Sequence, residues 1–202
     1  MGEVFLNGEI VDFQGPAPAT AIEAWTLLEQ FLGQSGLLIE RMGVDGQDWT
    51  PGGVSDSATY RKIEVFSVTQ EDKVSQIVAE LLRQGPALEE RWSACSRQVL
   101  SRPWVSFQKH GIELLNDTQP LVQSLGLLHE YAKGCQAEWG PSLGRATGHL
   151  NVELGSLLDA FEAGDCVVFS DVAESGILAG LQEIFRVLND EVASGLESGM
   201  TE

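Results

Sequence analysis

The sequence is poor in basic residues, and this scarcity excludes several classes of partner. Twelve Lys and Arg stand against thirty Asp and Glu, which gives the chain a formal net charge of −18. Nucleic-acid binding depends on clustered Lys and Arg that neutralise phosphates, and anionic membrane surfaces attract the same residues. Because the basic residues here are scattered along the chain, we expect neither nucleic acid nor a membrane surface as a partner.

Cysteine is also scarce, and the three cysteines lie far apart. Cys95, Cys135 and Cys166 contain no CxxC pair, so their spacing indicates neither a disulfide framework nor a zinc site. We interpret them as three reduced thiols in the protein core. The first residues lack the pattern of a signal peptide, and no apolar run approaches the ~18 residues of a membrane helix. A cytoplasmic location is therefore the expectation.

Motifs of catalysis and metal binding are missing as well. The chain has no Gly-x-Ser-x-Gly elbow and no Glu-x-x-His motif of the kind that builds two-metal sites in helical bundles. His110 with Glu113, and His149 with Glu153, are spaced as neighbours on a helix face, which is typical of local ion pairs. The acidic residues before Gly164 do not alternate as a calcium loop requires. We therefore expect no metal and no cofactor, although an enzyme assembled from distant residues stays open.

The first part of the chain carries clear signals of a hairpin and a helix. Asn7-Gly8 stands between two short apolar runs and predicts a β-hairpin with a type I′ turn. Thr20 with Glu23 three residues later forms a capping box, which predicts that a helix begins there. Gly33 and Gly36 predict its end.

Two more strands complete this region. They are predicted at residues 37–42 and 60–68, separated by a turn at 45–46 and by a loop at 49–57. The resulting order is strand, strand, helix, strand, short strand or loop, strand. It resembles the β-grasp, or ubiquitin-like, arrangement, in which one helix packs across a small mixed sheet. The resemblance implies a β-grasp-like domain over residues 1–68.

The hydrophobic period changes from two to 3.6 after residue 68, which predicts an all-helical bundle over residues 69–193 and a frayed tail over 194–202. The overall fold class is thus α+β. Thr69 and Asp72 form a second capping box at the start of the bundle. Helix ends are predicted near Gly85-Pro86 and at Asn116-Asp117, giving four or five helices.

The last predicted pair of helices, residues 150–192, meets at Gly164-Asp165, which we interpret as a helix stop followed by an N-cap. The region is strongly acidic, with Arg186 as its single basic residue from Leu150 to the end. Two apolar stripes are predicted to face the core: Leu150, Leu154, Leu157, Leu158 and Phe161, then Val168, Val172, Leu178, Leu181, Phe185, Leu188 and Val192.

The segment LLDAFEAGD, with its apolar helix ending in an acidic turn, looks like bacterial helical-hairpin chaperones of the flagellar export type. The two-part layout also resembles uncharacterised bacterial proteins of unknown function. Neither resemblance implies a catalytic residue.

The function we expect is a non-enzymatic protein–protein interaction module, such as an adaptor, assembly factor or chaperone. Acidic helical binders attract basic or amphipathic helices by charge and hold them by apolar contact. The expected partner-binding residues are Asp165, Asp171, Glu174 and Trp104. Self-association is a second interpretation, and an enzyme or small-ligand binder with a pocket between the two domains is a third.

Overall fold

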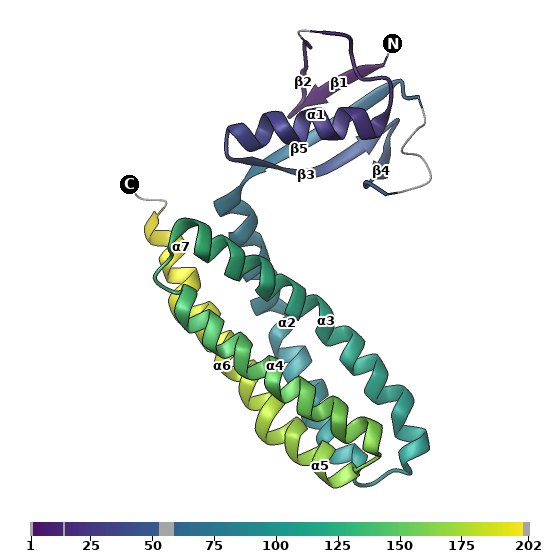
Figure 1. The fold of residues 1–202 in the computed structure, drawn as a ribbon, viewed down its shortest axis with the longest axis vertical. Coiled ribbons are helices and arrows are strands. Elements are labelled where there is room, and N and C mark those ends of the chain that lie inside the picture. The colour runs from purple at the N-terminus through teal and green to yellow at the C-terminus, as the bar shows by residue number, and fades with distance from the viewer. Residues whose placement is uncertain (1, 14, 53–58, 200–202) are drawn as a thin grey trace. The chain divides into compact units, whose positions relative to one another are not determined.

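The structure is a computed structural model that describes residues 2–13, 15–52 and 59–199. Its contacts divide the chain into two compact units, Met1–Lys73 and Val74–Glu202, which we call the sheet unit and the helical unit. The fold class is α+β, as the sequence predicts, because a small mixed sheet with one helix precedes a series of long helices (Figure 1). None of the described helices is both long enough and apolar enough to cross a membrane.

The sheet unit has five strands in the order β2-β1-β5-β3-β4. β1 pairs in parallel with β5, and the other neighbours are antiparallel. This order, with one helix between the second and third strands, is the β-grasp topology that the element order predicts. The elements are β1 (Glu3–Leu6), β2 (Glu9–Ile10), α1 (Ala21–Gln34), β3 (Leu37–Val44), β4 (Gln47–Trp49) and β5 (Lys62–Thr69). Residues 53–58 of the predicted loop lie outside the described residues.

Two tight turns fix the register of this sheet. Asn7 and Gly8 have φ angles of 52° and 85°, and Asp45 and Gly46 have 50° and 83°. Positive φ at both central residues is the type I′ geometry, which confirms the predicted hairpin turn. The Asn7 side chain also ties the hairpin to β5, because its amide donates to Ser67 Oγ (2.9 Å) and its carbonyl accepts from Ser67 N (3.0 Å).

Helix α1 begins where the capping box predicts. Glu23 N donates to Thr20 Oγ1 (3.4 Å), while Glu23 Oε2 accepts from the N–H of the preceding Ala19 (2.8 Å). One face of α1 is buried at Ala21, Ala24, Leu28 and Leu32. Most of that face packs against inward-facing residues of the strands, so α1 covers one side of the sheet unit's core.

The helical unit consists, over its described residues, of four helical rods that run side by side (Figure 1). Short connections make successive rods antiparallel, and α4 contacts α3, α5, η1 and α6. The rods are α2 (Gln70–Val99), α3 (Trp104–Cys135), α4 (Gly140–Ala163), and a last rod made of α5 (Cys166–Asp171), η1 (Val172–Leu178), α6 (Ala179–Val187), η2 (Leu188–Ala193) and α7 (Ser194–Gly199). α7 extends into the predicted tail, of which residues 200–202 lie outside the described residues.

Two predicted helix ends are wrong, because α2 runs through Gly85-Pro86 and α3 runs through Asn116-Asp117 and Pro120. Gly85 is a packing notch: a Cβ there would lie 2.9 Å from the Phe185 ring, so the missing side chain makes room for the last rod. Asp117 of α3 forms an ion pair with Arg91 of α2, which links the two helices. Tertiary packing thus outweighs the local stop signals.

The predicted turn at Gly164-Asp165 is confirmed. Gly164 ends α4 in the left-handed conformation with a φ of 69°, which favours glycine. Asp165 then caps α5, because its Oδ1 accepts from Val167 N (3.1 Å) and Val168 N (3.0 Å). An N-cap of this kind typically contributes ~1 kcal/mol to stability.

The stripe prediction for the last pair of helices is confirmed at ten of its twelve residues, which are buried or pack against the core, and is wrong at Leu158 and Val168. Val168 and Leu158 are 44% and 45% exposed, whereas the face of the last rod that points inward begins at the fully buried Phe169. From Phe169 the buried positions are spaced by four residues, namely Phe169, Ala173, Ile177 and Leu181. Each four-residue step on an α-helix rotates about 40° beyond a full turn. The π-helical η1 has more residues per turn, and this keeps the four positions on one face.

Candidate protein-binding site

The bundle tip is the end of the helical unit where residues 100–103 join α2 to α3 and residues 164–165 join α4 to α5. An aromatic cluster fills it. The ring centroid of Trp104 lies 5.5 Å from that of Phe107, 5.2 Å from that of Phe161 and 6.0 Å from that of Phe169. Phe107 and Phe169 are fully buried, while Trp104 is half-buried. Each aromatic pair adds ~0.5–1.5 kcal/mol to stability beyond simple burial, so the cluster stabilises the packing of the helices beneath the tip surface.

The structure brings together two of the four predicted partner-binding residues. A Cβ on Gly164 would lie 3.4 Å from Trp104 Nε1, so Trp104 packs against the turn that Asp165 completes. Asp171 and Glu174 are exposed on the same rod, about 9 and 13 Å farther along its axis. The four residues therefore do not form one compact cluster.

The tip also exposes aliphatic side chains that the sequence analysis missed. In the described part of the helical unit, six of the eight large apolar side chains that are exposed lie within about two and a half turns of the tip. They are Leu100, Val105, Ile112, Leu158, Val167 and Val168, with exposed fractions from 44% to 81%. One sign of this exposure was present in the sequence, because Val105 and Val167 are apolar residues next to, but not part of, the predicted apolar stripes. Several clustered exposed aliphatics are typical of an interaction surface, whereas isolated ones are ordinary.

Charges of both signs lie near these aliphatic residues, with Arg102 and Lys109 on the α2–α3 side of the tip and carboxylates on the α4–α5 side. Asp159, Glu162 and Asp165 are exposed near the end of α4 and in the following turn. Within the described part of the chain, no Lys, Arg or His nitrogen lies within 4.0 Å of their carboxylates. Their charges are therefore available to a partner, and at low salt they act over roughly 10 Å or more.

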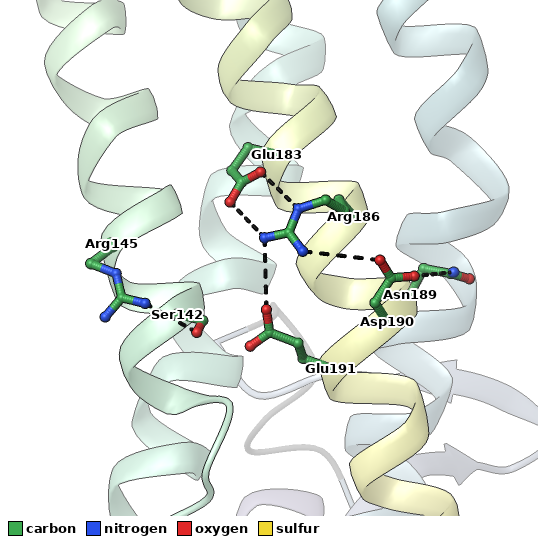
Figure 2. A network of polar contacts seen from close by, with 7 residues as sticks. All are labelled: Ser142, Arg145, Glu183, Arg186, Asn189, Asp190 and Glu191. Carbon is green, nitrogen blue, oxygen red and sulfur yellow. Dashed lines mark hydrogen bonds and ion pairs between the residues drawn. The ribbon is translucent and has the colours of Figure 1, made fainter.

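A second polar cluster lies on the faces of α4, α6 and η2 (Figure 2). Arg186 hydrogen-bonds both carboxylate oxygens of Glu183 (2.9 and 2.8 Å) and forms longer ion pairs with Glu191 (3.7 Å) and Asp190 (4.0 Å). The hydrogen bond from Arg186 is the main reason that the pKa of Glu183 is lowered. Because three carboxylates surround this guanidinium, its charge is already neutralised, and we assign it to helix stability.

Comparison with models of protein families, with curated proteins and with solved structures gives no match.

Among the described residues, the thiols of Cys135 and Cys166 contact nearby backbone carbonyls, and no hydrogen bond joins a histidine to a cysteine. His149 Nε2 lies 3.7 Å from Glu153 Oε1, which confirms the predicted local pair. The prediction of three core thiols holds for Cys95 only, because Cys135 is exposed and Cys166 is partly buried. Burial raises the pKa of the Cys95 thiol to about 11, so the reactive thiolate is disfavoured. No group of three or more His, Cys, Asp or Glu that might hold a metal ion occurs in residues 2–13, 15–52 and 59–199.

Proposed function

We propose that the helical unit is a protein-binding module whose bundle tip receives an amphipathic helix with a basic polar face. The observation that carries this proposal is the set of exposed aliphatic side chains near the bundle tip, where Trp104 is half-buried. Leaving them in water gains nothing for the fold, whereas covering them with an apolar helix face stabilises a complex by roughly 25 cal/mol per Å² of apolar surface removed from water.

Charge supports a basic partner. Asp159, Glu162 and Asp165 border the apolar residues, and the chain as a whole carries −18. A helix with Leu on one face and Lys on the other would place its apolar face on the tip and its ammonium groups near the carboxylates. Electrostatic steering of this kind raises the association rate and rejects acidic competitors. An adaptor, assembly factor or chaperone would use such a surface.

The direct test uses two synthetic helical peptides of about 14 residues, or four turns. Both carry Leu at i, i+3, i+4 and i+7, and they differ only in having Lys or Glu on the polar face. Fluorescence anisotropy with the full chain measures their affinities. We expect saturable binding of the Lys peptide that weakens with added salt, and no binding of the Glu peptide.

A paired substitution locates the binding surface. Val105→Thr with Val167→Thr keeps the side-chain shapes but makes two exposed tip positions polar, so the Lys peptide is expected to bind about tenfold more weakly. Val152→Thr is the matched control, because Val152 is 66% exposed on α4 and lies about three turns from the tip. Equal affinities of the tip variant and the control, or equal binding of both peptides, would contradict the proposal.

A further inference from the structure

A separate pocket lies between the last turns of α3 and the first turns of α4, at the opposite end of these helices from the bundle tip. Its volume is about 640 Å³, which falls in the range of small-molecule sites. Small residues form its floor, among them Ala132, Gly140 and Gly144. A Cβ on Gly140 would lie only 3.2 Å from Ala132 Cβ, so the two helices approach closely here and no large side chain fills the space.

The polar side chains that line this pocket are His129, Lys133, Gln136 and Arg145, and no described carboxylate lines it. This is unusual in a chain with a net charge of −18. The ammonium group of Lys133 is already paired with Glu130 (2.9 Å).

Arg145 differs from the other arginine on this side of the bundle. Figure 2 shows it apart from the carboxylates that gather around Arg186. Arg145 Nη2 donates to the neutral hydroxyl of Ser142 (3.2 Å), and no described carboxylate lies within 4.0 Å of its guanidinium. Glu183 acts on it only at longer range. The pocket therefore combines an apolar floor with a guanidinium whose charge has no close partner.

His129 adds a second polar group. Its Nδ1 is buried without a hydrogen-bond partner among the described residues, and its Cε1 lies 3.1 Å from the position of a Cβ on Gly144. A proton on Nδ1 would be a buried donor without an acceptor, which is costly. The proton of the neutral ring therefore belongs on Nε2, which makes Nε2–H the hydrogen-bond donor of this side chain.

We infer that this pocket binds a small organic monoanion with an apolar body, such as a medium-chain carboxylate. The carboxylate lies on the Arg145 guanidinium, and the hydrocarbon covers the floor formed by Ala132, Gly140 and Gly144. A compact inorganic anion gains nothing from that floor and is repelled by the negative field of the chain. This inference is independent of the protein-binding proposal, because the two sites share no residue.

Isothermal titration calorimetry on the full chain tests it with three probes: octanoate, octyltrimethylammonium and inorganic phosphate. We expect octanoate to bind with a stoichiometry of one, and the other two to give no saturable signal. The cation matches the chain length of octanoate but reverses the charge, and phosphate keeps the negative charge but lacks the apolar body.

Two variants test whether Arg145 binds the carboxylate of octanoate. Arg145→Gln removes the guanidinium from an exposed position and is expected to weaken octanoate binding about tenfold or more. Arg97→Gln, at an exposed position near the end of α2, makes the same change in net charge and is expected to leave octanoate affinity unchanged. Absence of octanoate binding, equal binding of octyltrimethylammonium or phosphate, or equal effects of the two variants would each overturn the inference.

Discussion

A buried hydrogen-bond relay between α2 and α3 offers a sharp test of how the helical unit is held together. Trp92 Nε1 donates to Thr118 Oγ1 (3.1 Å), and the Thr118 hydroxyl donates to Leu114 O (2.9 Å). Trp92 and Thr118 are each only 1% exposed. Water therefore does not replace the threonine hydroxyl as a partner for the indole N–H when that hydroxyl is removed.

Thr118→Val keeps the side-chain shape but leaves the indole donor of Trp92 buried and unpaired. Because an unsatisfied buried donor costs roughly 1–3 kcal/mol, the variant is expected to lose that much free energy of unfolding. Thr147→Val is the matched control. Thr147 Oγ1 is buried on α4 without a partner among the described residues, so its replacement by a methyl group is expected to be neutral or slightly stabilising.

Urea unfolding of the full chain, followed by circular dichroism at the helix band, measures both variants. With a slope of about 2 kcal/mol per molar urea, Thr118→Val is expected to lower the midpoint of the helical transition by about 0.5–1.5 M. Thr147→Val is expected to leave it unchanged or raise it. Equal losses in the two variants would refute the reasoning, because they would show that the hydroxyls matter for packing and not for the Trp92 hydrogen bond.

Three further predictions concern charge, capping and thiol reactivity. In Arg186→Gln, Glu183 loses the hydrogen bond that lowers its pKa from 4.5. A carboxyl group whose pKa is lower in the folded chain than in the unfolded chain stabilises the fold at a pH above the unfolded-state pKa. The wild type should therefore be more stable than the variant at pH 7, and this advantage should shrink as the pH falls below 4.5. A constant difference between pH 7 and pH 3 in thermal unfolding would contradict this. Asp165→Ala removes the N-cap and is expected to lower the free energy of unfolding by about 0.5–2 kcal/mol, whereas Asp165→Asn keeps the cap and removes only the charge. Equal losses of the two variants in chemical unfolding would show that the cap is unimportant. A thiol reagent should label the two other cysteines in the native chain and reach Cys95 only after unfolding, so rapid labelling of all three thiols would count against the buried core.

Local signals in the sequence were sufficient for most of the sheet unit. The Asn7-Gly8 turn and the Thr20 capping box each act within a few residues, so their physics is readable without the fold. The same holds for Gly164-Asp165, where a left-handed glycine is followed by an aspartate N-cap. These features are predictable because the backbone conformation and its partner lie in one short segment.

The helical unit shows where local signals fail. Gly85-Pro86 has the composition of a helix end, yet the glycine serves as a notch for Phe185, a residue a hundred positions later. The buried face that begins at Phe169 is set by a π-helical segment, whose turns do not follow the period of 3.6. Both features depend on contacts between rods, so the sequence pattern predicted the bundle and most of its buried residues but misplaced two helix ends and the exposed Leu158 and Val168.

The candidate binding surface was predictable only in part. Trp104 and Asp165 meet at the bundle tip because the turns between the rods bring residues sixty positions apart to one end. The exposed Val105 and Val167 are visible in the sequence as apolar residues, but nothing in the pattern tells which apolar side chains stay uncovered. That distinction requires the packed bundle.

The central claim is that the bundle tip contacts another protein, and site-specific photo-crosslinking tests it most directly. A photoreactive amino acid is placed at Val167 on the tip or at Val152 on α4, both of which are exposed and therefore tolerant of substitution. The full chain is then irradiated in a native lysate. The account predicts a discrete crosslinked protein at position 167 that is absent at position 152 and is competed away by the Lys peptide. The absence of any crosslink at 167, or the same products at both positions, would contradict it.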